Sequence, residues 1–322
     1  MKILLTGGAG FIGSNLAARC LQEKIDLDIV DDLSNGHVEF VDHFVKNDKL
    51  FVGSFDSDVI LDRVKSKEYD VIVHLAAIPR VSYSVEKPFE THETNVTSTL
   101  RLLDASRGNI KRFVFASSSS VYGGSEELPT HASVKKNPQS PYALQKSIIE
   151  DYLKMYHKLY GLDSISLRFF NVFGPNQIGG SPYSTAVSAW LTCIMKNQQL
   201  RSDGDGSQTR DMCYVDNVSD ACIKSILTKK ELKAAAINVA CGDRTSNKEI
   251  LNYLLNKFPD SKYYDAPWRP GDVMHTQADV SLSEELIGYK PLVKFWEGLD
   301  KTIDWYQNNQ ELIETLSAKE NI

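Results

Sequence analysis

The sequence predicts an α/β protein built on a doubly wound parallel sheet, with a smaller α/β lobe in its C-terminal part. Two observations predict this architecture. Short apolar runs, typical of buried parallel strands, alternate with helical segments along the first half of the chain. A glycine-rich turn joins the first of these runs, Lys2–Thr6, to a segment of helical composition, Ser14–Cys20. We expect the first lobe to span residues 1–171, with the chain returning to it at about 212–242, and the second lobe to span 172–322.

The glycine-rich turn in KILLTGGAGFIG predicts a dinucleotide site in a Rossmann-type domain. Glycines let the backbone turn tightly and approach a pyrophosphate, and the helix that follows offers free N–H groups and the positive end of its dipole. The second predicted strand, Asp26–Val30, runs into two carboxylates that suit an adenosine ribose and would repel a 2′-phosphate, so NAD is predicted rather than NADP. The cofactor contacts expected here are Gly7, Gly10, Phe11, Ile12, Gly13, Asp31 and Asp32.

The remaining elements continue the alternation and then change in character. Further strands of the first lobe are predicted at Leu50–Phe55, Asp70–Ala77, Arg112–Ser120 and Ser164–Phe170, with helices at Thr94–Arg107 and Pro141–Tyr160. Ligands of such a sheet bind outside the carboxyl ends of its strands. Beyond Asn171 we expect a helix at Ala186–Asn197, a polar turn at Asp203–Asp211, a late strand at Ala236–Gly242 and a closing helix from about Trp296.

Composition narrows the class of protein and its partners. The 322 residues carry a net charge of −6 without a basic block, so nucleic acid is not expected as a partner. No stretch approaches the ~20 apolar residues of a membrane helix. Five cysteines with no CxxC pair suggest free thiols in a reducing compartment, and no metal site is predicted. We therefore expect a soluble, cytoplasmic protein.

Tyr142 and Lys146 in SPYALQK predict acid–base chemistry. A spacing of four places both on one face of a helix. A tyrosine is a poor base at its usual pKa of ~10, but a neighbouring ammonium and an oxidised nicotinamide both favour the phenolate. Alone, this pair could be an aromatic and a solvated lysine on a surface helix. Its place after the glycine turn, the aspartate-ended strand and a serine-ended strand favours a catalytic pair.

With these motifs in order, the chain resembles the extended short-chain dehydrogenase/reductase superfamily, within its nucleotide-sugar epimerase and dehydratase branch. It looks most like the UDP-glucose and UDP-N-acetylglucosamine 4-epimerases. The resemblance covers nearly the whole length, through TGGAGFIG, HLAA, SSSSVYGG, SPYALQK, LRFFNVFGPNQ, GDGSQTRD and WRPGDVMHTQAD. It implies a tightly bound NAD, a UDP-sugar substrate and a homodimer joined through helices near 94–107 and 142–160.

The resemblance also implies roles for single residues. Tyr142 would take the proton from the sugar hydroxyl, Lys146 would hold the nicotinamide ribose, and Ser118 would hydrogen-bond the reacting oxygen between two donors. Further cofactor contacts implied are Leu75, Ala76, Ala77 and Asn95. The implied substrate contacts are Ser119, Asn171, Arg210, Arg269, Asp272 and Thr276.

Ser119 and Ser120 bear on the reaction. Dehydratases that resemble this chain usually have Asp-Glu at these places, and decarboxylases have a Glu at the second, whereas serines have no carboxylate to remove water or carbon dioxide. We therefore expect 4-epimerisation of a UDP-hexose, by oxidation at C4, rotation of the keto-sugar and re-reduction. Thr276 stands at a gatekeeper position and leaves room for an acetamido group, which admits UDP-GlcNAc and UDP-GalNAc beside UDP-Glc and UDP-Gal.

Alternatives and departures from the family pattern remain. UDP-glucuronate 4-epimerases tend to offer an arginine where this chain has Ser82, although Arg80 lies close by and could substitute. A 4,6-dehydratase, a decarboxylase and a non-catalytic NAD-sensing Rossmann protein are further alternatives. Ser54 stands where an aspartate usually meets adenine, and Asp203 stands where an aromatic residue or asparagine often lies near uracil.

Overall fold

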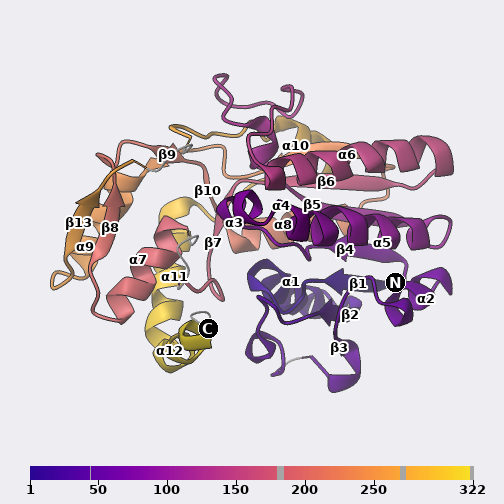
Figure 1. Cartoon of the computed structure of the whole chain (residues 1–322), viewed down its shortest axis with the longest axis horizontal. Coiled ribbons are helices and arrows are strands. Elements are labelled where there is room, and N and C mark those ends of the chain that lie inside the picture. The colour runs from indigo at the N-terminus through magenta and orange to yellow at the C-terminus, as the bar shows by residue number, and fades with distance from the viewer. Residues whose placement is uncertain (44, 180–184, 269–272, 320–322) are drawn as a thin grey trace.

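The computed structural model describes residues 1–43, 45–179, 185–268 and 273–319 and confirms the predicted doubly wound sheet. Within these residues, seven strands form one parallel sheet in the order β11-β6-β5-β4-β1-β2-β3 (Figure 1). Their bounds are β1 (Lys2–Thr6), β2 (Asp26–Asp31), β3 (Leu50–Val52), β4 (Val71–His74), β5 (Arg112–Ser118), β6 (Ser164–Phe169) and β11 (Ala235–Val239).

Helices cover both faces of this sheet. Alternation along β1 shows the two layers, because Ile3 and Leu5 join the apolar core beneath α1 and α8, whereas Leu4 joins the core beneath α2, α5 and α6. Burial on both faces explains why the central strands are continuous apolar runs. The covering helices are α1 (Phe11–Gln22), α2 (Asp58–Lys65), α5 (Thr99–Ser106), α6 (Pro141–Tyr160) and α8 (Val215–Leu227).

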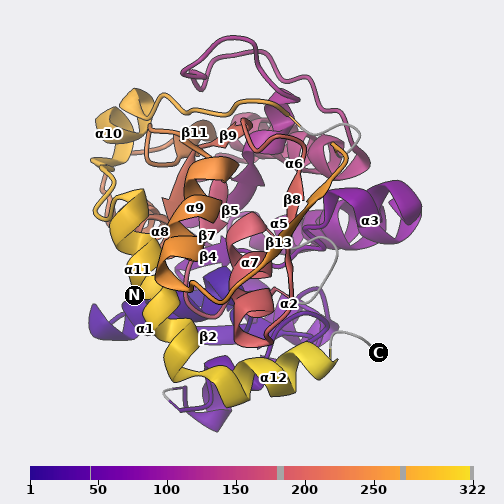
Figure 2. The same ribbon diagram turned by 90° about the vertical axis from the view of Figure 1, so that its left-hand side faces the viewer.

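The second lobe lies beside the carboxyl ends of the strands, on the left of Figure 1, and faces the viewer in Figure 2. Three small two-stranded pairings, β7 with β10, β8 with β13 and β9 with β12, accompany its helices in the described residues. Its strands are β7 (Asn171–Phe173), β8 (Leu200–Asp203), β9 (Thr209–Arg210), β10 (Met212–Tyr214), β12 (Thr245–Ser246) and β13 (Tyr263–Ala266). Its helices are α7 (Ala186–Met195), α9 (Asn247–Lys257), α11 (Phe295–Asn308) and α12 (Gln310–Lys319), whereas α10 (Ser281–Ile287) packs against β11 and α8 of the large sheet.

The helix α6 has the predicted bounds because local signals mark both of its ends. The side chain of Ser140 accepts a hydrogen bond from the amide of Ala143, and Pro141 occupies the first helical position. Gly161 ends the helix in the left-handed conformation, with φ +67°. The catalytic pair predicted from the sequence therefore lies in the first turns of a well-capped helix.

Several predicted strands are shorter than expected. The strand predicted to reach Phe55 ends at Val52, the one predicted to reach Ala77 ends at His74, and the serine-ended strand stops at Ser118. In each case apolar or small residues continue past the point where the chain leaves the sheet. These residues form the loops at the carboxyl ends of the strands, where a doubly wound sheet binds its ligand.

The connection from β4 to α5 also differs from prediction. The helix predicted from Thr94 begins instead as a π-helix, η3 (Glu93–Ser98). It is preceded by two short helices, α3 (Val81–Glu86) and α4 (Pro88–His92). Short 3-10 helices elsewhere are η1 (Val38–Phe40), η2 (Asn47–Lys49) and η4 (Ser119–Tyr122).

The structure also bears on the predicted free thiols and on membrane and metal sites. All five cysteines are free, and three of them, Cys20, Cys213 and Cys222, are buried. Among the helices of the described residues, none is long and apolar enough to cross a membrane. In the same part of the chain, no group of three or more His, Cys, Asp or Glu side chains is placed to hold a metal ion.

Candidate active site

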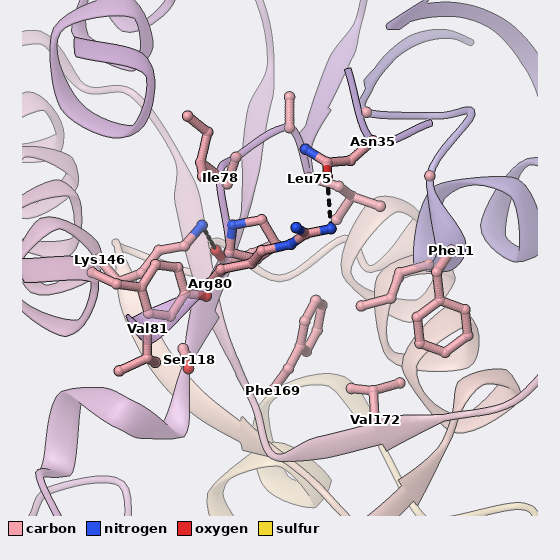
Figure 3. Close-up of a pocket in the computed structure, with 18 of the residues that line it drawn as sticks. Phe11, Asn35, Leu75, Ile78, Arg80, Val81, Ser118, Lys146, Phe169 and Val172 are labelled. Atoms are coloured by element: carbon pink, nitrogen blue, oxygen red, sulfur yellow. Dashed lines mark hydrogen bonds between the residues drawn. The ribbon is translucent and has the colours of Figure 1, made fainter. Parts of the chain in front are cut away.

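A cavity of about 1060 Å³ opens at the carboxyl ends of the central strands (Figure 3). It reaches from the glycine turn after β1 to the first turns of α6 and to the second lobe. Most residues predicted from the sequence line it together: Gly7, Gly10, Phe11, Ile12, Gly13, Asp31, Asp32, Leu75, Ala76, Ala77, Ser118, Ser119, Tyr142, Lys146, Asn171, Arg210 and Thr276.

A side chain is disfavoured for a different physical reason at each of the three glycines of the turn. Gly7 has φ +71°, and a Cβ there would lie 2.7 Å from the amide nitrogen of Ala76. A Cβ on Gly13 would lie 2.0 Å from the carbonyl oxygen of Gly7, so helix α1 could not pack against the turn. Gly10 has an ordinary φ of −76°, and the nearest atom to its Cβ would be 3.4 Å away. The protein's own packing therefore leaves open space at Gly10, which suits the close approach of a diphosphate.

Asp31, at the end of β2, is hydrogen-bonded to the glycine turn. Its two carboxylate oxygens accept hydrogen bonds from the amides of Ala9 and Leu33, each at 2.9 Å. Burial raises the pKa of Asp31, and these two amides offset part of that rise. Asp32 is exposed and accepts from the amide of Ser34 at 2.9 Å. Both carboxylates border the cavity, as expected for groups that face a ribose.

Tyr142 and Lys146 are both buried at the cavity wall. The Lys146 Nζ donates to the carbonyl of Ala116 at 2.7 Å and lies 5.8 Å from the centre of the Tyr142 ring. Burial lowers the pKa of Lys146 to about 7. Burial also raises the pKa of Tyr142 to about 12, while a hydrogen bond with Ser118 lowers it in part. Without a cofactor, Tyr142 is therefore protonated at neutral pH and needs added positive charge to act as a base.

Ser118 stands at the end of β5, facing Tyr142. Its Oγ accepts hydrogen bonds from the amide of Ser120 at 3.2 Å and from the Ser120 hydroxyl at 2.9 Å. These contacts turn the chain into η4 directly after the strand. Ser118 and Tyr142 can consequently hold one oxygen atom between them, as oxyanion stabilisation requires.

Asn95, expected among the cofactor contacts, lies behind the cavity wall. Its side chain bonds both the amide and the carbonyl of Ile78, at 2.8 and 3.1 Å, and donates to Gln145 at 2.8 Å. It is buried and is not among the described residues that line the cavity. Its place in the structure is to fix the loop after β4 against α6.

A buried ion pair that was not predicted from the sequence holds α6 against β5 and β6. Arg168 on β6 makes two hydrogen bonds to Glu150, at 2.8 and 2.7 Å, and Ser117 donates to the same carboxylate at 2.6 Å. Burial alone would raise the pKa of Glu150, but Arg168 and Ser117 hold it below its usual value. Glu150 lies one turn after Lys146, and this repeat of four was the signal available in the sequence. A second missed contact, from the amide of Tyr142 to Ser84 Oγ at 3.0 Å, had no local signal.

The second lobe supplies the remaining predicted residues. Asn171 begins β7, and Arg210 donates to the carbonyls of Thr209 and Met274 at 3.0 and 3.2 Å. Thr276 accepts from the amide of Asp211 at 3.1 Å. All three predicted residues border the cavity opposite the glycine turn. Two further predicted residues, Arg269 and Asp272, lie outside the described residues.

The lowered pKa of Lys146 predicts how the stability of the cofactor-free protein depends on pH. Its pKa is about 7 in the fold against an ordinary 10.5, so between these values the unfolded chain binds a proton that the folded protein does not. The free energy of unfolding should rise with pH across this window, by up to ~1.4 kcal/mol per pH unit from this group. Below pH 7 both states are charged, and the contribution is constant.

Replacing the lysine isolates its contribution from that of other titrating groups. Lys146→Met should remove this rise, which urea unfolding of both proteins at a series of pH values would measure. Parallel pH profiles for the two proteins would contradict a low pKa of Lys146.

Comparison with known proteins places the chain among sugar-nucleotide enzymes. Residues 3–240 match the model of the NAD dependent epimerase/dehydratase family. A putative UDP-glucose 4-epimerase of Methanocaldococcus jannaschii is 35% identical, over 95% of this chain and 99% of that protein. The UDP-glucose 4-epimerase of Mycolicibacterium smegmatis is 34% identical, over 97% of this chain and 100% of that protein.

Solved structures agree with these relatives. A UDP-N-acetylglucosamine 4-epimerase from Methanobrevibacter ruminantium, in complex with UDP-N-acetylmuramic acid, superposes with a TM-score of 0.88 at 33% identity, covering 96% of this chain and 98% of that one. Other relatives are named for a different substrate or a different reaction. A UDP-glucuronate 4-epimerase is 31% identical and a UDP-N-acetyl-α-D-glucosaminuronate decarboxylase is 29% identical. The similarity alone therefore leaves the sugar and the reaction open.

Proposed function

The chain belongs to the NAD-dependent epimerase/dehydratase family, with NAD as its cofactor, and from this premise we propose that it is a UDP-hexose 4-epimerase. The observation that carries the proposal is the group of Ser118, Tyr142 and Lys146 at the cavity wall, followed by serines where other reactions of the family need carboxylates. The glycine turn, with open space at Gly10, fits the dinucleotide.

The residues of this chain divide the work of the reaction. When bound, NAD would supply a reversible hydride acceptor for the oxidation and re-reduction at C4 of the sugar. Tyr142 removes the proton of the C4 hydroxyl and gives it back after the keto-sugar has turned over, and Ser118 hydrogen-bonds the same oxygen throughout. Lys146, charged in the complex, stabilises the Tyr142 phenolate by its proximity.

Ser119 and Ser120 support epimerisation over dehydration or decarboxylation. Elimination of water from a sugar needs an acid and a base beside the reacting carbons. A serine hydroxyl has no carboxylate to serve as either. Ser120 is moreover engaged with Ser118 through both its amide and its hydroxyl, which leaves it as a support of the catalytic serine.

Thr276 supports a substrate range that includes N-acetylhexosamines. It borders the cavity, and its hydroxyl accepts from the amide of Asp211. A threonine at this wall is smaller than a tyrosine by a whole ring, and the space admits an acetamido group at C2 of the sugar. We therefore propose UDP-GlcNAc and UDP-GalNAc as substrates together with UDP-Glc and UDP-Gal.

A direct assay tests the proposed reaction. Purified protein is incubated separately with UDP-Glc, UDP-GlcNAc and UDP-GlcA without added NAD, and the sugars are followed by NMR. We expect inversion at C4 of the first two. Loss of water or release of carbon dioxide would replace the proposal by a dehydratase or a decarboxylase, and no reaction with any sugar would favour a non-catalytic NAD-binding protein.

A UDP-glucuronate 4-epimerase is the second candidate. It is favoured by Arg80, which borders the cavity two residues before Ser82, the place where such enzymes tend to offer an arginine. A faster inversion of UDP-GlcA than of either hexose in the same assay would select this candidate.

We also propose that the protein forms a homodimer through α6 and the neighbouring helices. Four apolar side chains make an exposed stripe along α6: Leu144 (49% exposed), Tyr152 (37%), Met155 (51%) and Leu159 (58%). Their spacing places them on one side of the helix, away from the buried side chains that pack on the sheet. In a two-fold symmetric dimer, this stripe can pack against the same stripe of a second subunit.

Charges in this stripe should separate the dimer. We expect Met155→Glu and Leu159→Glu together to yield a monomer, because two carboxylates would be buried without partners in the interface. Light scattering after size-exclusion chromatography measures the mass. Lys154→Glu is the control, because Lys154 is exposed on α6 but lies outside the stripe. This variant should remain a dimer. A wild-type monomer, or a dimer unaffected by both stripe substitutions, would refute this interface.

A further inference from the structure

Arg80 and Asn35 form a bridge at the cavity. Arg80 stands at the start of α3, in the chain that follows β4, and Asn35 lies in the loop that follows β2. The Nη2 of Arg80 donates to the Asn35 Oδ1 at 3.1 Å, drawn as a dashed line in Figure 3. Both side chains border the cavity, and Arg80 is half-buried there.

The order of strands places this bridge over the glycine turn. In the sheet, β1 lies between β4 and β2, and Ile3 is paired with Val71 on one side and with Leu27 on the other. The loops after β4 and β2 therefore flank the glycine turn, which follows β1. A side chain that reaches from one flanking loop to the other must cross above the turn, where a diphosphate lies in this type of fold.

The glycine turn carries no cationic side chain that could pair with the charges of a diphosphate. Arg80, Lys146 and Arg210 are the lysine and arginine side chains among the described residues that line the cavity. Lys146 donates to the carbonyl of Ala116 beside Tyr142, and Arg210 donates to two carbonyls of the second lobe. Arg80 is thus the one whose contact spans the turn. Its planar guanidinium has five N–H donors, enough to bond Asn35 and phosphate oxygens at the same time.

We propose that Arg80 binds the diphosphate of NAD and that Asn35 positions its guanidinium over the glycine turn, so that NAD leaves only when the Arg80–Asn35 bridge opens. Glycine-turn amides then hold the diphosphate from below and Arg80 holds it from above. The inference goes beyond the proposed epimerase activity, because retention of NAD requires no sugar. It also assigns Arg80 to the cofactor, and not to the carboxylate of a uronic acid.

Release of the reduced cofactor tests the bridge without any turnover. The protein is loaded with NADH and mixed with a large excess of NAD, and the fall in NADH fluorescence gives the dissociation rate. The variants are Arg80→Ala, Arg80→Lys and Asn35→Ala. Arg244→Ala is the matched control, because Arg244 is an exposed arginine of the second lobe that does not line the cavity.

Loss of a charge-assisted contact should make release from Arg80→Ala roughly 10- to 100-fold faster than from the wild type. Arg80→Lys keeps the charge without the planar fork, and Asn35→Ala keeps the fork without its anchor, so both should release NADH at intermediate rates. Arg80→Ala should also weaken the dependence of NADH affinity on salt, since one ionic contact is gone. Arg244→Ala should match the wild type in both measurements.

The outcomes separate this proposal from the proposed function. Wild-type release rates in Arg80→Ala would overturn the contact with the diphosphate, and wild-type rates in Asn35→Ala would overturn the bridge. If Arg80→Ala does not fold, as judged by circular dichroism, the comparison of Arg80→Lys and Asn35→Ala with the wild type decides by the same criterion. If the variants release NADH faster than the wild type, the bridge is supported. If the wild type also inverts no sugar, only the proposed epimerase activity is refuted.

Discussion

Tyr142→Phe is expected to abolish turnover of every sugar while the protein keeps its NAD. The substitution removes one oxygen atom and leaves the ring, which is buried at the start of α6 and lies beside Lys146. Without that oxygen, the proposed reaction has no group to take the proton from the C4 hydroxyl, and the hydrogen bond with Ser118 is lost. General acid–base catalysis contributes about 10²- to 10⁴-fold, so the residual rate should fall at least to this extent.

Two measurements on the same sample check this expectation. NMR of the C4 proton gives the rate of inversion, and the absorbance of NAD released on denaturation gives the cofactor content. Tyr253→Phe is the matched control, because it removes a hydroxyl that donates to Asp300 at 2.6 Å in the second lobe. Retained inversion in Tyr142→Phe would remove Tyr142 from the mechanism, whereas loss of bound NAD would make its role structural.

The pKa values of Tyr142 and Lys146 explain why the protonation of Tyr142 depends on its surroundings. Burial raises the pKa of Tyr142 to about 12 and lowers that of Lys146 to about 7 in the protein without cofactor. Neither group is then in the form that the reaction needs over much of the neutral range. A phenolate and an ammonium stabilise one another at close range, and an oxidised nicotinamide adds a further positive charge beside the phenolate. The pair is therefore expected to become competent as a unit, and its titration belongs to both residues.

Features of this protein that depend on neighbouring residues were predictable from the sequence. The bounds of α6 follow from Ser140, Pro141 and Gly161, each of which acts within one turn of the helix end. The spacing of Tyr142 and Lys146 is equally local. The strand ends were less predictable, because apolar residues continue from β4 into Leu75 although hydrogen bonding to the sheet has ended. Apolar composition indicates that a residue is buried, but residues of the strand and residues of the cavity loop are both buried. Composition therefore does not show where the strand ends.

Contacts between distant segments could not be predicted in this way. Ser84 meets the amide of Tyr142 across 58 positions, and Arg80 meets Asn35 across 45. Asn95 shows the same limit, because its bonds to Ile78 and Gln145 are set by the packing of α6 on the loop after β4. Each of these contacts can be predicted only once the order of the strands in the sheet is known. Short sequence motifs thus identify the residues of the site, whereas contacts between distant segments of the fold hold them in place.

Gly13→Ala is expected to destabilise the protein strongly, and Gly10→Ala to spare the fold while it removes the cofactor. A methyl group on Gly13 would lie 2.0 Å from the carbonyl oxygen of Gly7 and 2.6 Å from Gly8 Cα, and both are backbone atoms that cannot move aside without opening the turn. We expect a loss of about 3 kcal/mol in the free energy of unfolding, at the upper end of overpacking effects, together with loss of NAD.

At Gly10 the same methyl group would meet only the Gly7 oxygen, at 3.4 Å, and the backbone there already has an ordinary φ. Stability of the cofactor-free Gly10→Ala protein should therefore stay within about 1 kcal/mol of the wild type. Its affinity for NADH should nevertheless fall, because the methyl group fills the space through which a diphosphate approaches the backbone. Urea unfolding of the cofactor-free proteins and fluorescence titration with NADH separate the two effects. Wild-type NADH affinity in Gly10→Ala would show that the diphosphate lies elsewhere, and wild-type stability in Gly13→Ala would show that α1 can withdraw from the turn at little cost.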